Sequence, residues 1–236
     1  MSAAELSFDL PGGGHVLFTA RAHGNLSSVG GIDVEHGLQA RERLRRQIGV
    51  ERLQRGYQVH GTKVLRSRID TDFSAQDSAT AQPPVEADGQ ATSVAGIGAI
   101  VLTADCLPVA LGADGAVAIV HAGWRGLAAG ILEEGVRAVR ELGGEDDIVA
   151  IIGPGAGPCC YEVGEEVHTA FGGAHRAQGP HTRNIDLKAI ARDRLLAAGA
   201  REVRDVAVCT ICDEHFFSHR REGARAGRQG AVAWLS

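Results

Sequence analysis

The sequence has few aromatic side chains, a single methionine and no strong excess of one charge sign. Aromatic residues make up 4% of the 236 positions, so valine, isoleucine, leucine and alanine must fill the interior. A formal net charge of −5 gives no general attraction to nucleic acid or to anionic membranes, and we expect neither as a partner. No run approaches the 18 apolar residues of a membrane-spanning helix, and residues 1–10 lack the apolar core of a signal peptide. These absences predict a cytoplasmic protein.

A disulfide framework is also excluded. The five cysteines are odd in number and irregularly spaced, which predicts reduced thiols. Cys159-Cys160 and the pair Cys209 and Cys212 lack partners at zinc-finger spacing, so we interpret them as packing residues of the core or of turns. A hydrophobic content of 44% is sufficient for a sizeable core.

The order of patterned segments predicts one domain over residues 1–236, because helices and strands alternate without a dividing linker. Asp186 is the expected N-cap of a helix that Gly199 ends. The polar segment 70–84 is expected to be a loop. The expected strands flank residues 11–14 and cover 100–103, 148–152, 203–208 and 231–235, and the expected helices cover 38–48, 127–142, 161–171 and 187–198.

A predicted β-hairpin brings two soft metal ligands, Cys106 and His121, close together. Two apolar runs flank Gly112-Ala113-Asp114-Gly115, which is typical of a hairpin turn. If Ala113-Asp114 is the two-residue loop, Cys106 faces His121 directly, with Cβ atoms about 5 Å apart. If the loop is Asp114-Gly115, the pair is diagonal but still on one face, because the strand period is two. A three-residue loop would place the two on opposite faces.

These residue types suit zinc or copper, with His60 as the expected third ligand, since it precedes Gly61 at a strand end. Three protein ligands leave one position open, as in catalytic zinc sites, where the metal lowers the pKa of bound water to about 7 or polarises a substrate atom. The same residues also allow a metal-free cysteine hydrolase, with Cys106 as nucleophile and His121 as base.

Arginines near such a site would bind an anion. Arg125 follows His121 by four residues, at a strand-to-helix turn where the helix N-terminus also favours negative charge. Arg21, Arg220, Arg221 and Arg228 could add to the same anion site, although for Arg228 a solvated basic face is the favoured interpretation.

Seven motifs occur in order along nearly the whole chain: Gln58-Val59-His60-Gly61, Glu86-Ala87-Asp88-Gly89, Thr103-Ala104-Asp105-Cys106-Leu107-Pro108, His121-Ala122-Gly123-Trp124-Arg125-Gly126, Gly153-Pro154 with Cys160-Tyr161-Glu162-Val163, Asn184-Ile185-Asp186-Leu187 and Phe216-Phe217-Ser218-His219-Arg220-Arg221. In these motifs the chain resembles the laccase-domain (YfiH-like) proteins, also called multicopper polyphenol oxidase-like proteins, purine nucleoside phosphorylases or peptidoglycan-editing factors. The segment after Arg21, and Ala40-Arg41, depart from the family pattern.

The resemblance implies a single α+β domain of mixed sheets flanked by helices, and zinc held by His60, Cys106 and His121. It further implies a purine nucleoside enzyme that cleaves adenosine, inosine and methylthioadenosine with inorganic phosphate and deaminates adenosine. Asp105 or Asp88 is then expected to move protons as the catalytic carboxylate.

For the phosphate-dependent cleavage that the resemblance implies, we expect Arg125, Arg21 and Arg220 to bind phosphate. A copper-dependent polyphenol oxidase (laccase) is the first alternative, although the 10 histidines form no His-x-His motif. A zinc amidase that edits peptidoglycan precursors is the second, and a binding module without catalysis is the third. A monomer or a homodimer would fit any of these readings.

Overall fold

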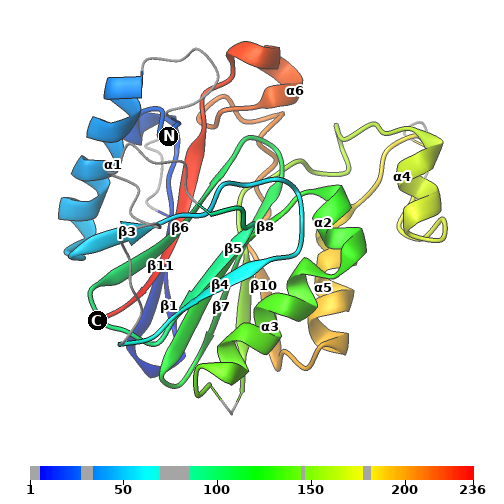
Figure 1. Ribbon diagram of the computed structural model, residues 1–236. Helices are drawn as coiled ribbons and strands as arrows, with labels where there is room; N and C mark the ends of the chain where they lie inside the picture. Colours follow the sequence, from blue (N-terminus) through cyan, green and yellow to red (C-terminus); the bar gives the residue numbers. More distant parts are fainter. Residues whose placement is uncertain (1–5, 28–33, 70–84, 145–146, 178–181) are drawn as a thin grey trace.

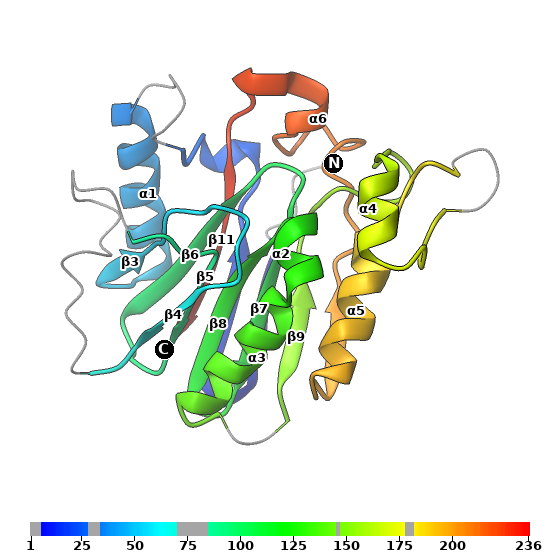
Figure 2. The same ribbon diagram turned by 45° about the vertical axis from the view of Figure 1, so that its right-hand side comes forward.

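The computed structural model describes residues 6–27, 34–69, 85–144, 147–177 and 182–236. In this part of the chain two mixed β-sheets pack face to face, and helices cover both outer faces (Figures 1 and 2). The expected α+β class is therefore confirmed. No helix in the described ranges combines the length and the apolar character needed to cross a membrane.

The first sheet has five strands in the order β1-β2-β11-β6-β3, and its one parallel pair is β3 with β6. Its strands are β1 (Leu6–Leu10), β2 (Gly14–Phe18), β11 (Gln229–Leu235), β6 (Ile97–Thr103) and β3 (Arg52–Gln54). The second has six strands in the order β10-β9-β7-β8-β5-β4, parallel at both edges. Its strands are β10 (Glu202–Asp205), β9 (Val149–Ile152), β7 (Leu107–Ala113), β8 (Ala116–Ala122), β5 (Gly89–Thr92) and β4 (Val64–Ser67).

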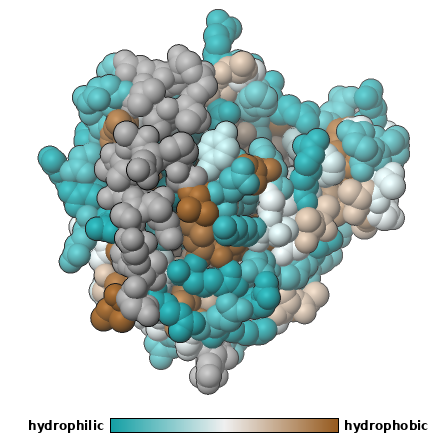
Figure 3. All heavy atoms as spheres, viewed as in Figure 1, coloured by the Kyte–Doolittle hydropathy of each residue, from teal (hydrophilic) through white to brown (hydrophobic). Residues whose placement is uncertain are grey.

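The described helices are α1 (Val34–Ile48), α2 (Trp124–Ala129), α3 (Ile131–Glu141), α4 (Glu165–Ala170), α5 (Leu187–Ala197) and α6 (His219–Glu222), with short 3₁₀ turns at Pro11–Gly13, Arg21–His23 and Gly223–Arg225. Helix α1 packs on the five-stranded sheet, whereas α2, α3 and α5 pack on the six-stranded sheet (Figure 2). In the orientation of Figure 1, hydrophilic residues cover most of the surface that Figure 3 colours by hydropathy, and hydrophobic residues form small separate groups.

Strand β8 illustrates how the sequence builds these layers. Its residues Ala116, Ala118 and Val120 belong to the core under the helices, whereas Val117 and Ile119 belong to the core between the sheets. This alternation follows from the two-residue period of a strand. His121 continues the second set, so its side chain lies on the face toward the other sheet, at the end of the strand.

Most expected elements are present, with corrections at two of the expected helices. The helix expected over 127–142 is two helices, because Gly130 adopts a left-handed backbone (φ 104°) between α2 and α3. Of the helix expected over 161–171, only α4 is helical. Helix α5 begins after Asp186, whose side chain accepts a hydrogen bond from the backbone of Ala189 as expected. The expected loop 70–84 lies outside the described residues.

The hairpin follows the second of the registers considered above. Ala113 pairs with Ala116, so the turn is Asp114-Gly115 and the interpretation with Ala113-Asp114 as the loop is wrong. His121 pairs with Pro108, and Cys106 precedes β7 by one residue. Cys106 and His121 are therefore diagonal neighbours rather than directly opposed.

Candidate metal centre

His60, Cys106 and His121 converge at one end of the interface between the two sheets. One ligand atom from each residue lies within 4.8 Å of the others. Sγ of Cys106 is 3.9 Å from Nε2 of His60, and the two imidazole rings have centroids 4.9 Å apart at an angle of 70°. A thiolate and two imidazoles at these separations can close on one cation. The side chains expected from the sequence to meet do meet.

Asp88, directly before β5, holds two of the three ligands. Oδ1 of Asp88 lies 2.8 Å from Nδ1 of His121 and accepts the backbone N–H of His60 at 2.9 Å. Oδ2 of the same carboxylate accepts the N–H groups of Val59 and Gly61 at 3.0 and 2.7 Å. Because Nδ1 of His121 is used in this way, its Nε2 is left for a metal.

The backbone is strained at this site in two places. His60 has φ 62° and Asp105 has φ 87°, values that residues with a β-carbon rarely adopt. The three amide hydrogen bonds to Asp88 hold the turn at His60. Asp105 is held by Thr210 Oγ1, Ser218 Oγ and the backbone N–H of Arg220, at 2.7, 3.1 and 2.7 Å. Strain of this kind persists only where surrounding contacts fix it, and it is common at functional sites.

Two positions in the segment after β8, Gly123 and Gly126, have no room for a β-carbon. A β-carbon at Gly123 would lie 2.6 Å from Cδ2 of His60 and 3.2 Å from Sγ of Cys106. A β-carbon at Gly126 would lie 2.8 Å from the carbonyl oxygen of Gly61. Both glycines therefore allow the His60 loop to approach the start of α2 closely.

The electrostatics favour a charged pair at the centre. Burial raises the pKa of the Cys106 thiol, but the charge of His121 and hydrogen bonds from both histidines outweigh it and lower that pKa to about 6. Burial lowers the pKa of His121, but the charge of Cys106 and the hydrogen bond to Asp88 outweigh it and raise that pKa to about 9. A thiolate is thus available at neutral pH, and a metal would displace the imidazole proton.

A cavity of about 400 Å³ opens beside the three ligands, a volume in the range of small-molecule sites. Its walls come from both sheets and from the C-terminal segment. They are formed by Ser27, Arg55, Tyr57, Gln58, His60, Leu102, Thr103, Ala104, Cys106, His121, His219, Ala224, Ala226 and Arg228. Tyr57 is 45% exposed and offers a ring for stacking at the mouth.

Arg55 is the feature of this cavity that the sequence reasoning missed. Its side chain is 8% exposed, and its buried Nε has no hydrogen-bond partner among the described residues. Burial lowers the pKa of the guanidinium without removing its charge. A buried guanidinium whose Nε finds no acceptor in the part of the chain that the structure describes, at the wall of a cavity, is suited to an anionic ligand. Arg228, interpreted above as part of a solvated face, also lines the cavity and donates to the carbonyl oxygens of Ala226 and Gly227.

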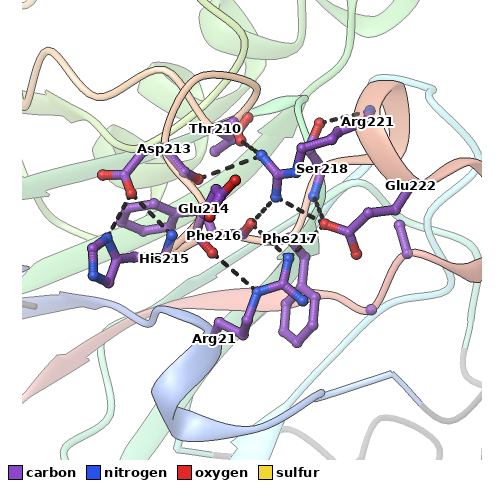
Figure 4. A network of polar contacts seen from close by, with 12 residues as sticks. Arg21, Thr210, Asp213, Glu214, His215, Phe216, Phe217, Ser218, Arg221 and Glu222 are labelled. Carbon is purple, nitrogen blue, oxygen red and sulfur yellow. Dashed lines mark hydrogen bonds and ion pairs between the residues drawn. The ribbon is translucent and has the colours of Figure 1, made fainter.

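The three arginines expected to bind phosphate have other contacts. Arg21 is paired with Glu222 at 2.5 Å, and its guanidinium lies 4.3 Å from the ring centroid of Phe217 (Figure 4). It donates to two further backbone carbonyls, those of Glu214 and Phe216.

Arg125 lies over its neighbour Trp124 at 4.3 Å from the ring centroid. Arg220 lies over the ring of Tyr161 at 4.6 Å and donates to the carbonyl oxygen of Glu162 at 2.6 Å. Neither of these two side chains, nor that of Arg21, lines the cavity.

Comparisons with known proteins identify relatives of this chain in sequence and in fold. The sequence model of a family described as "Multi-copper polyphenol oxidoreductase laccase" matches residues 14–236. A purine nucleoside phosphorylase of Xylella fastidiosa is 41% identical over 245 residues, covering 96% of this chain and 89% of its own. An adenosine deaminase from an unknown prokaryotic organism is 36% identical, covering 86% and 84%. A crystal structure of a Neisseria meningitidis protein has a TM-score of 0.83 and 30% identity, covering 98% and 99%.

Proposed function

Because the chain belongs to the multi-copper polyphenol oxidoreductase laccase family, we propose that it is a zinc-dependent enzyme of purine nucleosides. The reaction proposed is phosphorolysis of adenosine, inosine or methylthioadenosine, with adenosine deamination as a second activity. The observation that carries the proposal is the convergence of His60, Cys106 and His121 beside an open cavity. The names of the relatives, a purine nucleoside phosphorylase and an adenosine deaminase, support the substrate class.

The donor set fits zinc. One thiolate and two imidazoles beside the cavity form a three-ligand set, and a zinc ion held by such a set would keep one position for water or substrate. His60 and His121 would bind through nitrogen and Cys106 through sulfur, while Asp88 keeps His121 in the tautomer that exposes Nε2. Zinc bound there would supply a Lewis acid that activates water or polarises a substrate atom.

Phosphate is the anion proposed for Arg55. A guanidinium can bind two phosphate oxygens at once, and a buried one does so without competition from bulk water. Arg228 lines the same cavity and adds positive charge to it. Arg21, Arg125 and Arg220 stay predicted phosphate ligands, but each would have to leave a contact described above in order to enter the cavity.

Asp88 and Asp105 stay the predicted catalytic carboxylates, but their contacts also suggest a positioning role. Both carboxylates accept hydrogen bonds from backbone groups and side chains, and both are buried. We propose that they act first as positioning groups, Asp88 for the two histidines and Asp105 for the backbone before Cys106. A general acid or base must instead reach substrate directly or through one water.

The test is an assay of nucleoside cleavage. Purified protein is incubated with adenosine and with inosine, each with and without inorganic phosphate, and free base, sugar phosphate and inosine are measured. The expected result is base release that requires phosphate, inosine formation from adenosine, and loss of both in Cys106→Ala. Base release from inosine without phosphate would contradict phosphorolysis.

The same preparation separates the alternatives. Metal analysis is expected to give zinc rather than copper at the three-ligand centre. Bound copper, together with oxygen consumption when a phenol is added, would support the hypothesis of a copper-dependent polyphenol oxidase, which the family description suggests. Activity in fully metal-free protein would support the cysteine hydrolase. Release of an amino acid from a peptidoglycan precursor, with inert nucleosides, would support the editing reading.

The proposed setting is the cytoplasm, where the five free cysteines would stay reduced. Light scattering distinguishes the two oligomeric states expected from the sequence, a monomer and a homodimer.

A further inference from the structure

Four cysteines outside the candidate metal centre form a second cluster. Cys159 and Cys160 lie in the turn after β9, and Cys209 and Cys212 lie in the loop after β10. Their Sγ atoms all lie within 4.8 Å of one another. Sγ of Cys212 is 3.3 Å from that of Cys159 and 3.0 Å from that of Cys160. The sequence offered these residues no partners at zinc-finger spacing and favoured a packing role, but in the structure each pair of cysteines lies beside the other.

The arrangement fits four-coordinate zinc. Zn–S bonds are about 2.3 Å long, which gives about 3.8 Å between sulfurs in a tetrahedron. The separations of Cys212 Sγ from Cys159 and Cys160, 3.3 and 3.0 Å, are shorter than this value, and no separation in the cluster exceeds 4.8 Å, so small side-chain shifts would give a tetrahedron. Both distances exceed the roughly 2.05 Å of a disulfide bond. Cys209 and Cys212 have the C-x₂-C spacing of zinc sites, which sequence alone could not match to Cys159 and Cys160 about 50 residues away.

The backbone around the cluster is arranged to stabilise a thiolate. The N–H of Gly157 donates to Sγ of Cys209 at 3.2 Å, and the N–H groups of Ile211 and Cys212 donate to the same sulfur. Such amide donors offset the negative charge of a metal-bound thiolate. Cys159 and Cys212 are exposed, so a cation can reach the cluster from solvent.

We propose that Cys159, Cys160, Cys209 and Cys212 bind a second, structural Zn²⁺. Binding replaces the thiol protons, which pass to solvent, and involves no oxidation. All four ligands come from the protein, so the site has no open position and no catalytic role.

The proposed ion would connect two loops that border the candidate metal centre. Next to Cys160 is Tyr161, on whose ring Arg220 lies. Next to Cys209 is Thr210, which donates to Asp105, the residue before the ligand Cys106. The carbonyl groups of Thr210 and Ile211 also accept hydrogen bonds from Arg221. The second zinc would thus fix the loops that hold Asp105 and α6.

Metal analysis of the full chain, purified under reducing conditions, tests the proposal. The expected content is two zinc per chain in the native sequence, one in Cys106→Ser, one in Cys212→Ser and none when both are changed. Two zinc retained in Cys212→Ser, or none in Cys106→Ser, would overturn the second site.

Cobalt spectroscopy keeps the test independent of whether Cys212→Ser folds. Co²⁺ titrated into metal-free Cys106→Ser, where the remaining cysteines are these four, is expected to give an intense sulfur-to-cobalt charge-transfer band that saturates at one Co²⁺ per chain. Absence of that band would overturn the proposal. A mass lower by two hydrogens, restored by a reductant, would overturn it in favour of a disulfide. Neither readout uses nucleoside turnover, so failure of the proposed reaction and failure of this site are distinguishable.

Discussion

The carboxylate of Asp88 and the imidazole of His121 form a hydrogen bond of 2.8 Å inside the molecule, with Asp88 fully buried and His121 4% exposed. The same carboxylate accepts the backbone N–H of His60. One acidic side chain therefore sets the ring orientation of one ligand and the backbone of another. Removing this carboxylate should therefore weaken metal binding more than it destabilises the fold.

The first prediction concerns Asp88→Asn. The amide keeps the size of the side chain but cannot accept all the N–H groups that the carboxylate accepts, and it favours no single tautomer of His121. We expect zinc affinity at the three-ligand centre to fall by about 10- to 100-fold. Competition with a chromophoric chelator measures this. Asp114→Asn, on the exposed hairpin turn, is the matched control and should keep native affinity.

The second prediction concerns Gly123→Ala. Because the new β-carbon would lie 2.6 Å from His60 and 3.2 Å from Cys106, one of these ligands must move. We expect loss of one zinc per chain with most of the secondary structure retained, measured by metal analysis and circular dichroism. In Gly61→Ala the nearest atoms are 3.6 Å away, so this neighbouring substitution should keep the metal. Equal metal content in both variants would show that the close approach at Gly123 is unimportant.

The sequence predicted the elements and residues that depend on local pattern. The two-residue period and a glycine-flanked turn placed Cys106 and His121 on one face, although the choice between two turns was open. That choice depends on backbone torsion at Asp114 and Gly115, which composition does not fix. Gly130 was missed as a helix break because glycine is tolerated inside helices and only its left-handed torsion separates α2 from α3.

The features that sequence reasoning missed are those that depend on distant contacts. The four-cysteine cluster joins two loops that are neighbours only because β9 and β10 pair in parallel. Arg55 carries no motif signal, and its importance follows from burial beside the cavity, which only the folded chain reveals. Asp88 and Asp105 were selected as carboxylates near the ligands, but their hydrogen-bond partners could not be read from spacing.

The third prediction concerns Arg55→Met. Replacing a buried cation by an apolar side chain of similar length removes a desolvated charge, so thermal stability should be unchanged or higher. Loss of charged hydrogen bonds worth about 2 kcal/mol should raise the KM for phosphate by roughly 30-fold. Steady-state kinetics at varied phosphate measures this. Arg125→Met is the comparison, because it tests the phosphate role expected from sequence. A larger increase of the KM for phosphate in Arg125→Met than in Arg55→Met would show that Arg125 is the main phosphate ligand.

The fourth prediction concerns the pH dependence of stability through Glu222. This carboxylate accepts hydrogen bonds from Arg21 at 2.5 Å and from Arg221 at 2.8 Å (Figure 4). Partial burial raises its pKa, but the two guanidinium groups and the N–H of Ser218 outweigh burial and hold it below the ordinary 4.5. Because the folded state binds the proton more weakly, the stabilisation is complete above pH 4.5 and is lost as pH falls through the folded pKa.

Glu222→Gln is therefore expected to lower the free energy of unfolding by about 1 kcal/mol at neutral pH, a value reduced by the partial exposure of the pair. The difference from the native sequence should shrink at an acidic pH below the lowered pKa of Glu222, where the folded state also takes up the proton. Urea unfolding at the two pH values, with a chelator in every sample because acid also releases metal, measures both effects. Glu202→Gln, at an exposed pair with Arg204, should give a smaller difference at either pH. A difference at Glu222 that stays constant with pH would mean that its packing, rather than its charge, stabilises this segment.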